Sequence, residues 1–384
     1  MPQRLLQHLR HFITALGLLI VCLIGAELWL RARGPMPVPV VATQADLFDQ
    51  RQLIPSATQH HQMRPLAEIR GDTVSFQTNS LGLRGPEPEI PAPAGMLRVL
   101  LLGDDAVVGS WLQAKHTLSQ QLQNRLTEYL RRSVEVINGG VPGYSPILSV
   151  LHYEHVLHTL EPDIVILHFD MSDVADEVVH RSRLRQVGSR NVCIHPVLAQ
   201  PAGASNGLIS ILRQSAVVHG LLDGLEIRTD MPQQSQRYNW THSDSNNVTA
   251  QVKHAMDSVD LLKALATKHG SSLIVTTTPV AWQVLSPAKH PEFSRQFGVT
   301  GDQAVASDVP FRILNAWGRS REVPVCLVVD VFRDQNLIKT PEQLFRNDSA
   351  RLSKYGTALH ARELALKIRE TSGLVAGRSR RRLQ

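Results

Sequence analysis

The chain has 384 residues, 43% of them hydrophobic and 19% charged, a balance that predicts a folded core and excludes general disorder. Its net charge of +6 is concentrated at the ends, because residues 1–33 hold four arginines against one glutamate and residues 377–384 hold four more arginines. The body is close to neutral and offers no basic face to a phosphate backbone, so we expect no nucleic-acid partner. Three cysteines are too few for a disulfide scaffold, and only Cys193 and Cys326 could pair.

An apolar run over residues 12–30 predicts a membrane anchor. The run carries a single charge, Glu27, and as a helix it would span about 28 Å, the thickness of a bilayer core. A cleaved signal peptide is the alternative, but the run is longer than a usual signal core and no small-x-small cleavage site follows it. We therefore expect residues 1–33 to form the anchor and residues 12–30 to contact membrane lipid, with the body extracytoplasmic, on the periplasmic or cell-surface side.

Two segments flank the main domain. Residues 34–95 contain nine of the 22 prolines, which predicts an extended stalk that leads into the domain. Within this stalk, the pattern of residues 73–85 predicts a short strand and a glycine-bearing turn that pack on the main domain. At the other end we expect a basic, disordered tail over residues 374–384, with a contact to anionic lipid or polymer as the alternative.

The body, residues 96–373, alternates short apolar runs with segments of helical spacing. This alternation predicts an α/β domain with a five-stranded parallel sheet between two layers of helices, the three-layer doubly wound (flavodoxin-like) architecture. The predicted strands are 97–104, 134–140, 163–170, 272–280 and 324–332. The predicted helices are 117–132, 146–160, 250–269 and 354–372. The polar stretch 181–249 is too long for an ordinary connection and predicts an insertion over one end of the sheet.

In such sheets ligands bind at the carboxyl ends of the strands. The segments at these ends, in their order and spacing, resemble the four sequence blocks of the SGNH (GDSL-type) hydrolases. They are GDDAVVG at 103–109, NGGVPGYS at 138–145, the Asp-bearing turn at 170–173 and the D-x-x-x-L-x-x-x-G pattern at 348–356. The resemblance extends over residues 73–372. It implies an esterase fold from a family that acts on acyl esters of lipids, polysaccharides and peptidoglycan, and for a membrane-anchored member it implies a glycan-related role.

The catalytic residues of that family are replaced in this chain. The resemblance implies a Ser nucleophile at the position of Asp105 and a His base at the position of Arg351, with Asp348 as the acid that orients the base. It further implies oxyanion-hole donors at Gly140, which is retained, and at Ser172, where the family has Asn. Neither half of the Ser–His dyad is therefore present.

The two replacements cannot perform the ordinary chemistry. A guanidinium stays protonated, so Arg351 has no lone pair with which to accept a hydroxyl proton. A carboxylate at Asp105 would repel the oxyanion of its own transition state. The opposite charges predict instead an ion pair, with Arg351 within about 4 Å of Asp105 or Asp348. Such a pair is either a repurposed binding or catalytic pair or a salt bridge that holds a degenerate cleft closed.

The sequence supports three hypotheses of function. The first is a membrane-anchored, catalytically impaired pseudo-hydrolase that binds an acylated or glycan ligand in the ancestral cleft. The second is an active ester hydrolase or O-acyl transferase of cell-surface polysaccharide with relocated residues, in which His360 or a histidine of the insertion 181–249 acts as base. The third is a non-catalytic protein-interaction module. We expect no cofactor and no metal.

Three further groups of residues have both a chemical and a structural interpretation. Four acids after the third predicted strand could hold a divalent cation, but they also fit a helix cap with solvated charges. These acids are Asp170, Asp173, Asp176 and Glu177. Three histidines at helical spacing could in principle share a metal, although a solvated helix face explains them far better. These histidines are His152, His155 and His158. Ser110 could act as a displaced nucleophile, but its spacing places it inside a helix.

Overall fold

The computed structural model of the chain covers most of the body and part of the lead-in. The described residues are 39–41, 52–70, 74–198, 237–241, 249–291, 307–334, 337–346 and 351–379, with six single positions between 14 and 25. The predicted anchor at 12–30 lies mostly outside these residues, as do much of the insertion, Asp348 and the last part of the basic tail. Among the residues that are described, no helix combines the length and the apolar character needed to cross a membrane.

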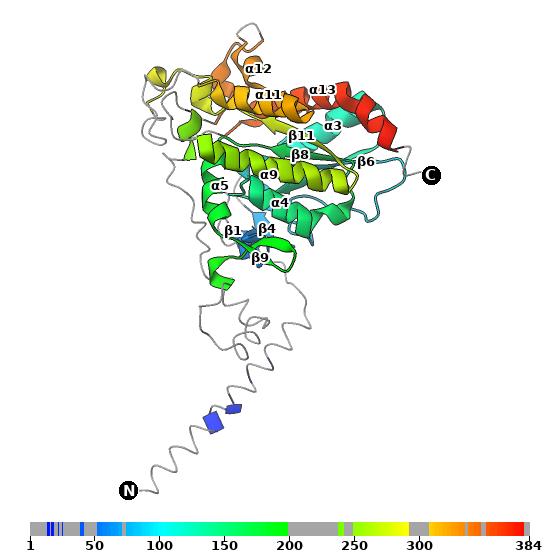
Figure 1. Cartoon of the computed structure of the whole chain (residues 1–384), viewed down its shortest axis with the longest axis vertical. Coiled ribbons are helices and arrows are strands. Elements are labelled where there is room, and N and C mark those ends of the chain that lie inside the picture. Colours follow the sequence, from blue (N-terminus) through cyan, green and yellow to red (C-terminus); the bar gives the residue numbers. More distant parts are fainter. Residues whose placement is uncertain are drawn as a thin grey trace.

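Five parallel strands form the central sheet, as the alternating sequence predicts (Figure 1). They are β6 (Leu97–Gly103), β7 (Val134–Gly140), β8 (Ile164–His168), β11 (Ser272–Thr277) and β12 (Val325–Leu327). Their order across the sheet is β12-β11-β8-β6-β7, so the direction of winding reverses between β6 and β8. Strands β6 and β8 are buried along their whole length. This burial explains why their sequences are continuous apolar runs rather than alternating ones.

The fifth predicted strand is much shorter than the sequence indicates. Strand β12 has three residues, and the second half of the predicted strand 324–332 is instead the short helix α12 (Val329–Arg333). Phe332 of α12 is fully buried and contacts Phe345, with the ring centroids 6.1 Å apart. A short buried apolar run has no periodicity that separates a strand from a helix, which explains the error.

Helices cover both faces of the sheet (Figure 1). The longer ones are α3 (Leu118–Leu130), α4 (Pro146–His155), α5 (Asp173–Ser182), α9 (Thr249–Lys268), α11 (Val309–Arg321) and α13 (Lys354–Ser379). Helices α3 and α13 pack against each other, and α4, α5 and α9 form a second packed group. Helix α11, which the sequence analysis did not predict, packs on β12 and is joined to α9 by an ion pair between Arg321 and Asp260 at 2.9 Å.

The lead-in packs on the main domain, as the pattern of residues 73–85 predicts. Its strands are β1 (Pro39–Val41), β2 (Leu53–Pro55), β3 (His61–Met63), β4 (Glu68–Arg70) and β5 (Ser75–Gln77). Arg84 follows β5, and its buried guanidinium donates hydrogen bonds to the carbonyl groups of Val108, Gly109 and Leu112. Burial lowers the pKa of Arg84 to about 10. The lead-in is thereby fixed directly beside the carboxyl end of β6.

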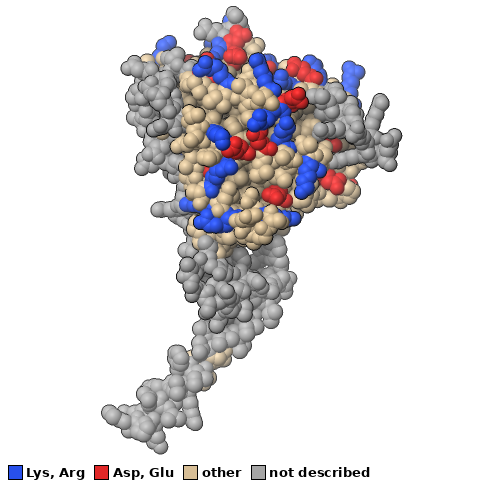
Figure 2. Space-filling model, in the orientation of Figure 1, with Lys and Arg blue, Asp and Glu red and all other residues tan. Residues whose placement is uncertain are grey.

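The described parts of the insertion 181–249 contact both the lead-in and the sheet. The insertion begins with a hairpin of β9 (Leu184–Val187) and β10 (Arg190–Cys193), and Cys193 forms a β-bridge with Gln59 of the lead-in. At its far end the buried Trp240 donates a hydrogen bond to the carbonyl of Met171 at 2.6 Å. On the face shown in Figure 2, positive and negative side chains of the described residues are intermingled.

Candidate functional site

The carboxyl ends of β6, β7 and β8 bring together the predicted site positions. Asp105 follows β6, Gly140 ends β7 and Ser172 follows β8. Because the strands are parallel, these three residues lie at one edge of the sheet, as predicted. The reversal of winding between β6 and β8 is the place where ligands bind in open α/β sheets. The fourth predicted position, Asp348, lies outside the described residues.

A single helical turn, α2 (Asp105–Val108), positions Asp105. Asp104 caps this turn, because its carboxylate accepts a hydrogen bond at 3.1 Å from the N–H group two residues on. Gly109 ends the turn with a φ of 59°, a left-handed conformation that favours glycine. The turn lies tightly against β7, since a Cβ added at Gly140 would lie 2.7 Å from the side chain of Val107. Both glycines are therefore required by the geometry of the turn.

Arg351 approaches Asp105, as the sequence predicts. Its Nη2 atom lies 3.8 Å from Asp105 Oδ2, and its guanidinium lies over the ring of Trp111, 4.9 Å from the centroid. The side chains of Arg351 and Asp105 are 32% and 21% exposed, so the pair is half-buried and partly screened by solvent. A cation thus lies at the position that the resemblance assigns to the base, and an anion lies at the position that it assigns to the nucleophile.

The two predicted oxyanion-hole positions have hydrogen-bond partners within the protein. The Gly140 N–H donates to Asn138 Oδ1 at 3.1 Å. The Ser172 hydroxyl donates to Asp170 Oδ1 at 2.9 Å and accepts a hydrogen bond from Arg237 Nη2 at 3.2 Å. The N–H of Ser172 also donates to Asp170 Oδ1. These groups are therefore engaged by neighbouring side chains.

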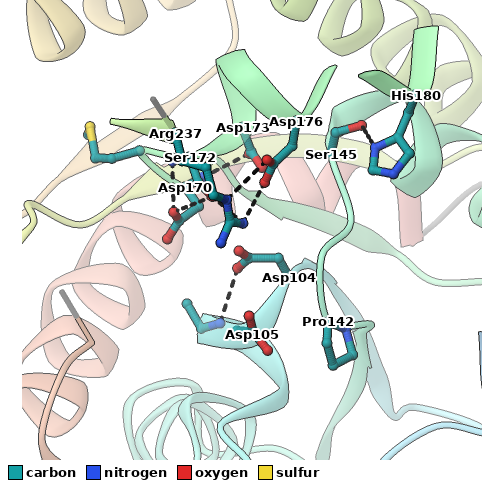
Figure 3. A network of polar contacts seen from close by, with 12 residues as sticks. Asp104, Asp105, Pro142, Ser145, Asp170, Ser172, Asp173, Asp176, His180 and Arg237 are labelled. Atoms are coloured by element: carbon teal, nitrogen blue, oxygen red, sulfur yellow. Dashed lines mark hydrogen bonds and ion pairs between the residues drawn. The ribbon is translucent and has the colours of Figure 1, made fainter. Parts of the chain in front are cut away.

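Four carboxylates gather at the same edge of the sheet, around the start of α5 (Figure 3). This acidic cluster consists of Asp104, Asp170, Asp173 and Asp176. Asp104 is buried, and so are Asp173, Asp176 and the neighbouring Glu177, so the expected solvated charge is wrong for these last three acids. Arg237, from the insertion, pairs with Asp176 at 2.6 Å between Nη2 and Oδ2 and at 3.1 Å between Nε and Oδ1. One arginine thus contacts one side of a group of four carboxylates.

Burial and mutual repulsion raise the pKa values in the acidic cluster. Burial, followed by the charges of Asp170 and Asp105, raises the pKa of Asp104 well above its ordinary value. Burial, followed by Asp104 and Asp170, does the same to the pKa of Asp173. Burial also raises the pKa of Asp176, while Arg237 opposes the rise. The cluster therefore favours bound protons or a nearby cation over free carboxylates.

His360, the proposed relocated base, lies on the buried face of α13. It is 1% exposed, and its Nε2 atom lies 2.7 Å from Thr276 Oγ1 on β11. Its ring packs against that of His168, with centroids 5.5 Å apart. Burial lowers the pKa of His360 well below its ordinary value. These contacts hold His360 against the sheet as a neutral side chain.

The three helical histidines do not face a common ligand. His152 is buried and contacts the ring of Tyr144, so the expected solvated face is wrong for this residue. The Nε2 atom of His155 lies 2.9 Å from the carbonyl oxygen of Asn191, and the Nδ1 atom of His158 lies 3.2 Å from the carbonyl oxygen of Tyr153 in α4. Their ring nitrogens are thus directed to separate partners.

Two smaller predictions can also be compared with the structure. Ser110 does not lie inside a helix, because Gly109 ends α2 after one turn; it is buried in the turn that follows. Cys193 and Cys326 are both buried and unpaired, one on β10 and the other on β12. They do not form the one disulfide that the sequence of the body allows.

A second buried group of titratable residues joins the lead-in to α5 and the insertion. This histidine cluster consists of His60, His61, His180 and His195. The Nδ1 atoms of His60 and His61 lie 2.8 Å apart, and the ring of His60 packs 4.7 Å from that of His195 and 5.3 Å from that of His180. The Nδ1 atom of His180 in turn lies 3.2 Å from Ser145 Oγ (Figure 3). Burial lowers the pKa of His61 to about 4 and that of His180 well below its ordinary value.

The patterns in the sequence did not predict a role for Arg237, His168 or the histidine cluster. Arg237 lies in a long polar stretch, and no neighbouring pattern marks it as a buried partner of Asp176. His168 did carry a signal, because it is the one imidazole in an otherwise apolar strand that ends at the candidate site. The members of the histidine cluster come from three separate segments, the lead-in, α5 and the insertion, so only the folded chain brings them together.

Comparisons with known proteins give structural similarities alone. No family model and no curated protein matches the sequence. One similar solved structure is a two-domain esterase active on acetylated mannans, at 12% identity and a TM-score of 0.40 over 72% of this chain; this chain spans half of that protein. An acetyl xylan esterase is 13% identical, with a TM-score of 0.40 over 70% of this chain and 98% of its own. A G-D-S-L family lipolytic protein from Desulfitobacterium hafniense is 10% identical, with a TM-score of 0.37 over 70% and 98% of the two chains.

The fold itself agrees with the resemblance in the sequence. In chain order the five strands are arranged 2-1-3-4-5, and the first three blocks lie at the carboxyl edge of that sheet. Arg351 of the fourth block reaches the same edge through Asp105. The strand order is that of a flavodoxin-like fold, and these blocks lie at the edge where the resemblance to the SGNH hydrolases places them.

Proposed function

We propose that this chain is a catalytically impaired SGNH-type domain that binds an acylated or glycan ligand at the ancestral site, on a protein anchored in a membrane. The observation that carries the proposal is the ion pair between Arg351 and Asp105 at the two dyad positions. A Ser–His pair works because neutral imidazole removes the hydroxyl proton and then returns it. Neither the guanidinium nor the carboxylate of the present pair can take these roles.

The surroundings of the pair also favour binding over catalysis. The N–H of Gly140 and the hydroxyl of Ser172 each have a partner within the protein, so a developing oxyanion would compete with Asn138 and Asp170 for them. His360 is bonded to Thr276 in the core, which is unfavourable for a relocated base.

Binding needs an accessible polar surface, and the half-buried pair provides one. Arg351 presents a guanidinium over an aromatic ring, and Asp105 beside it can accept hydrogen bonds from hydroxyl groups. A sugar offers hydroxyl groups and apolar ring faces to such a surface. The glycan assignment itself comes from the resemblance to the SGNH family.

The membrane anchor is proposed from the apolar run at 12–30 and its flanking charges. We expect the full-length chain to fractionate with membranes and to require detergent for extraction. A chain that begins after residue 33 is the matched control, and it is expected in the soluble fraction. Recovery of the intact full-length chain without detergent would contradict the anchor.

The proposal of impaired catalysis is tested by labelling with a serine-directed fluorophosphonate and by hydrolysis of a short-chain ester. The purified full-length protein is expected to show neither. The double variant Asp105→Ser, Arg351→His restores the residue types of the dyad, and Arg351→His alone is its control. Labelling of a residue at this edge in the unmodified protein would overturn the proposal and favour an active hydrolase with relocated residues.

Ligand binding is tested with one oligosaccharide in acetylated and deacetylated forms. We expect saturable binding that weakens in Arg351→Ala, because this change removes the exposed cation but leaves the fold of the sheet edge intact. If neither form binds and the protein also lacks esterase activity, the interaction module becomes the better hypothesis.

A further inference from the structure

Three side chains lie close together near the carboxyl ends of β6 and β8, where the direction of winding reverses. None of them belongs to the Asp105–Arg351 pair. Asp104 caps α2, His168 ends β8, and Asp170 follows β8 by two residues. One carboxylate oxygen from each aspartate and one ring nitrogen of His168 all lie within 4.8 Å of one another. Asp104 and His168 are buried, and Asp170 is half-buried. The group therefore combines two oxygen donors and one nitrogen donor in a site largely shielded from water.

His168 has an unsatisfied nitrogen in this group. It is 1% exposed, and its Nε2 atom lies 3.3 Å from Thr278 Oγ1. Its Nδ1 atom is buried and has no hydrogen-bond partner among the described residues. A buried polar atom without a partner carries a free-energy cost, and a ligand that accepts its lone pair removes that cost. Contact with a hydroxyl on the other nitrogen fixes the ring orientation, as metal-binding histidines require.

The two carboxylates of the group are not ion-paired. Within the described residues, neither Asp104 nor Asp170 forms an ion pair with a lysine or arginine. Arg237 is close enough for its charge to act on Asp104, but two of its nitrogens are bonded to Asp176 (Figure 3). The carboxyl group of Asp173 also lies beside this group, because it accepts a hydrogen bond from the N–H of Asp170. Negative charge that is buried and unpaired is unfavourable, and a bound cation would neutralise it.

We propose that Asp104, His168 and Asp170 form a binding site for a divalent first-row transition ion such as Zn²⁺ or Mn²⁺. Carboxylates alone would suit Mg²⁺ or Ca²⁺ equally well, whereas an imidazole ligand selects for the transition ions. Nδ1 of His168 is the nitrogen that binds, because Nε2 contacts Thr278. Ser172, which donates to Asp170, orients the second carboxylate. Three protein ligands leave a coordination position open to water or to an oxygen atom of a ligand.

The test is a calorimetric titration of Zn²⁺ and Mn²⁺ into the full-length, chelator-treated protein. We expect saturable binding of one ion per chain, and we expect Mg²⁺ and Ca²⁺ to bind much more weakly. Asp170→Asn and His168→Leu each remove one ligand, so each should weaken the highest-affinity Zn²⁺ site at least about 100-fold.

Two matched variants separate the proposed site from general effects of charge and burial. Asp173→Asn removes a buried carboxylate from the same acidic cluster but not from the ligand set. His152→Leu removes another buried histidine whose Nδ1 atom has no hydrogen-bond partner among the described residues. Both should retain tight Zn²⁺ binding. Thermal unfolding without metal checks that each variant folds; if His168→Leu does not fold, the half-buried Asp170→Asn decides the question.

Each outcome bears on the site directly. The absence of saturable binding in the wild type, or equal Zn²⁺ affinity in Asp170→Asn and the wild type, would overturn the site. Equal affinity for Mg²⁺ and Zn²⁺ would overturn the class of ion. Because binding is measured without any enzymatic readout, this result is independent of the fluorophosphonate test of the proposed function.

Discussion

Two buried titratable groups meet on helix α5, and burial acts on them in opposite directions. Its N-terminal turn carries Asp173 and Asp176 of the acidic cluster, while His180 near its C-terminus belongs to the histidine cluster. Burial raises the pKa values of the acids and lowers that of the histidine. In both cases burial disfavours the charged form. One helix thus contains a region that becomes less stable as pH rises and a region that becomes less stable as pH falls.

The two clusters also differ in how charge is compensated. The acidic cluster is held by a buried ion pair with Arg237, whereas the histidine cluster consists of neutral rings that bond to one another, to a backbone carbonyl group and to Arg183. Removal of a single partner should therefore be most costly in the acidic cluster. Acidification should be most costly in the histidine cluster.

The largest effect is expected from Arg237→Met, which leaves the buried carboxylate of Asp176 without its cation. An unpaired buried charge of this kind costs about 3–5 kcal/mol. Urea unfolding at neutral pH measures the loss. The double variant Asp176→Asn, Arg237→Met removes both charges and should recover much of the stability. Equal losses in the single and double variants would show that packing, rather than charge, accounts for the effect.

Acidification should reveal the histidine cluster. In the unfolded chain His61 takes up a proton as the pH falls below its ordinary pKa of 6.5, whereas in the folded protein it does so only near pH 4. The contribution of neutral His61 to the free energy of unfolding is therefore lost as the pH falls from 6.5 to about 4. Between these pH values the wild type should lose about 3 kcal/mol more than His61→Gln. Urea unfolding across the pH range tests the difference. Parallel stability curves for the two proteins would contradict the shift.

The contribution of Glu177, beside the acidic cluster, to the free energy of unfolding should depend on pH in the opposite direction and by a similar amount. Burial raises the pKa of Glu177 from 4.5 to about 7, so the folded state binds its proton more tightly than the unfolded chain. Its contribution to stability is therefore present below pH 4.5 and is lost as pH rises to about 7. Relative to Glu177→Gln, the wild type should lose about 3 kcal/mol over that rise. A difference of the same sign as that of His61 would contradict the comparison between the clusters.

The smallest effect is expected at Asp105 and Arg351, because this ion pair is only half-buried and its closest charged atoms lie 3.8 Å apart. A double-mutant cycle with Asp105→Ser and Arg351→His should give a coupling energy below about 1 kcal/mol. The buried pair of Arg237 and Asp176 should have a larger coupling energy. A coupling energy of several kcal/mol would mean that Asp105 and Arg351 are more deeply buried in solution than their exposed fractions indicate.

The sequence by itself determined the sheet and the replaced dyad. Short, continuous apolar runs that alternate with helical segments are typical of a covered parallel sheet, so strands such as 97–103 and 134–140 were predicted to within a residue. The pairing of Asp105 with Arg351 was also predictable, because opposite charges replaced two positions that the family holds in contact. Local pattern and residue type were sufficient in both cases.

Only the tertiary structure decided which polar residues are buried and with which partners. The acids of α5 have the sequence of a solvated helix start, and the packing of the insertion across them makes Asp176 a partner of Arg237 from a distant segment. His168 becomes a candidate metal ligand because the fold places it beside Asp104, which follows a different strand. The strand β12 ends early because burial of α12 replaces strand pairing. Contacts between residues far apart in the chain depend on how the layers close over the sheet, and no periodicity in the sequence encodes them.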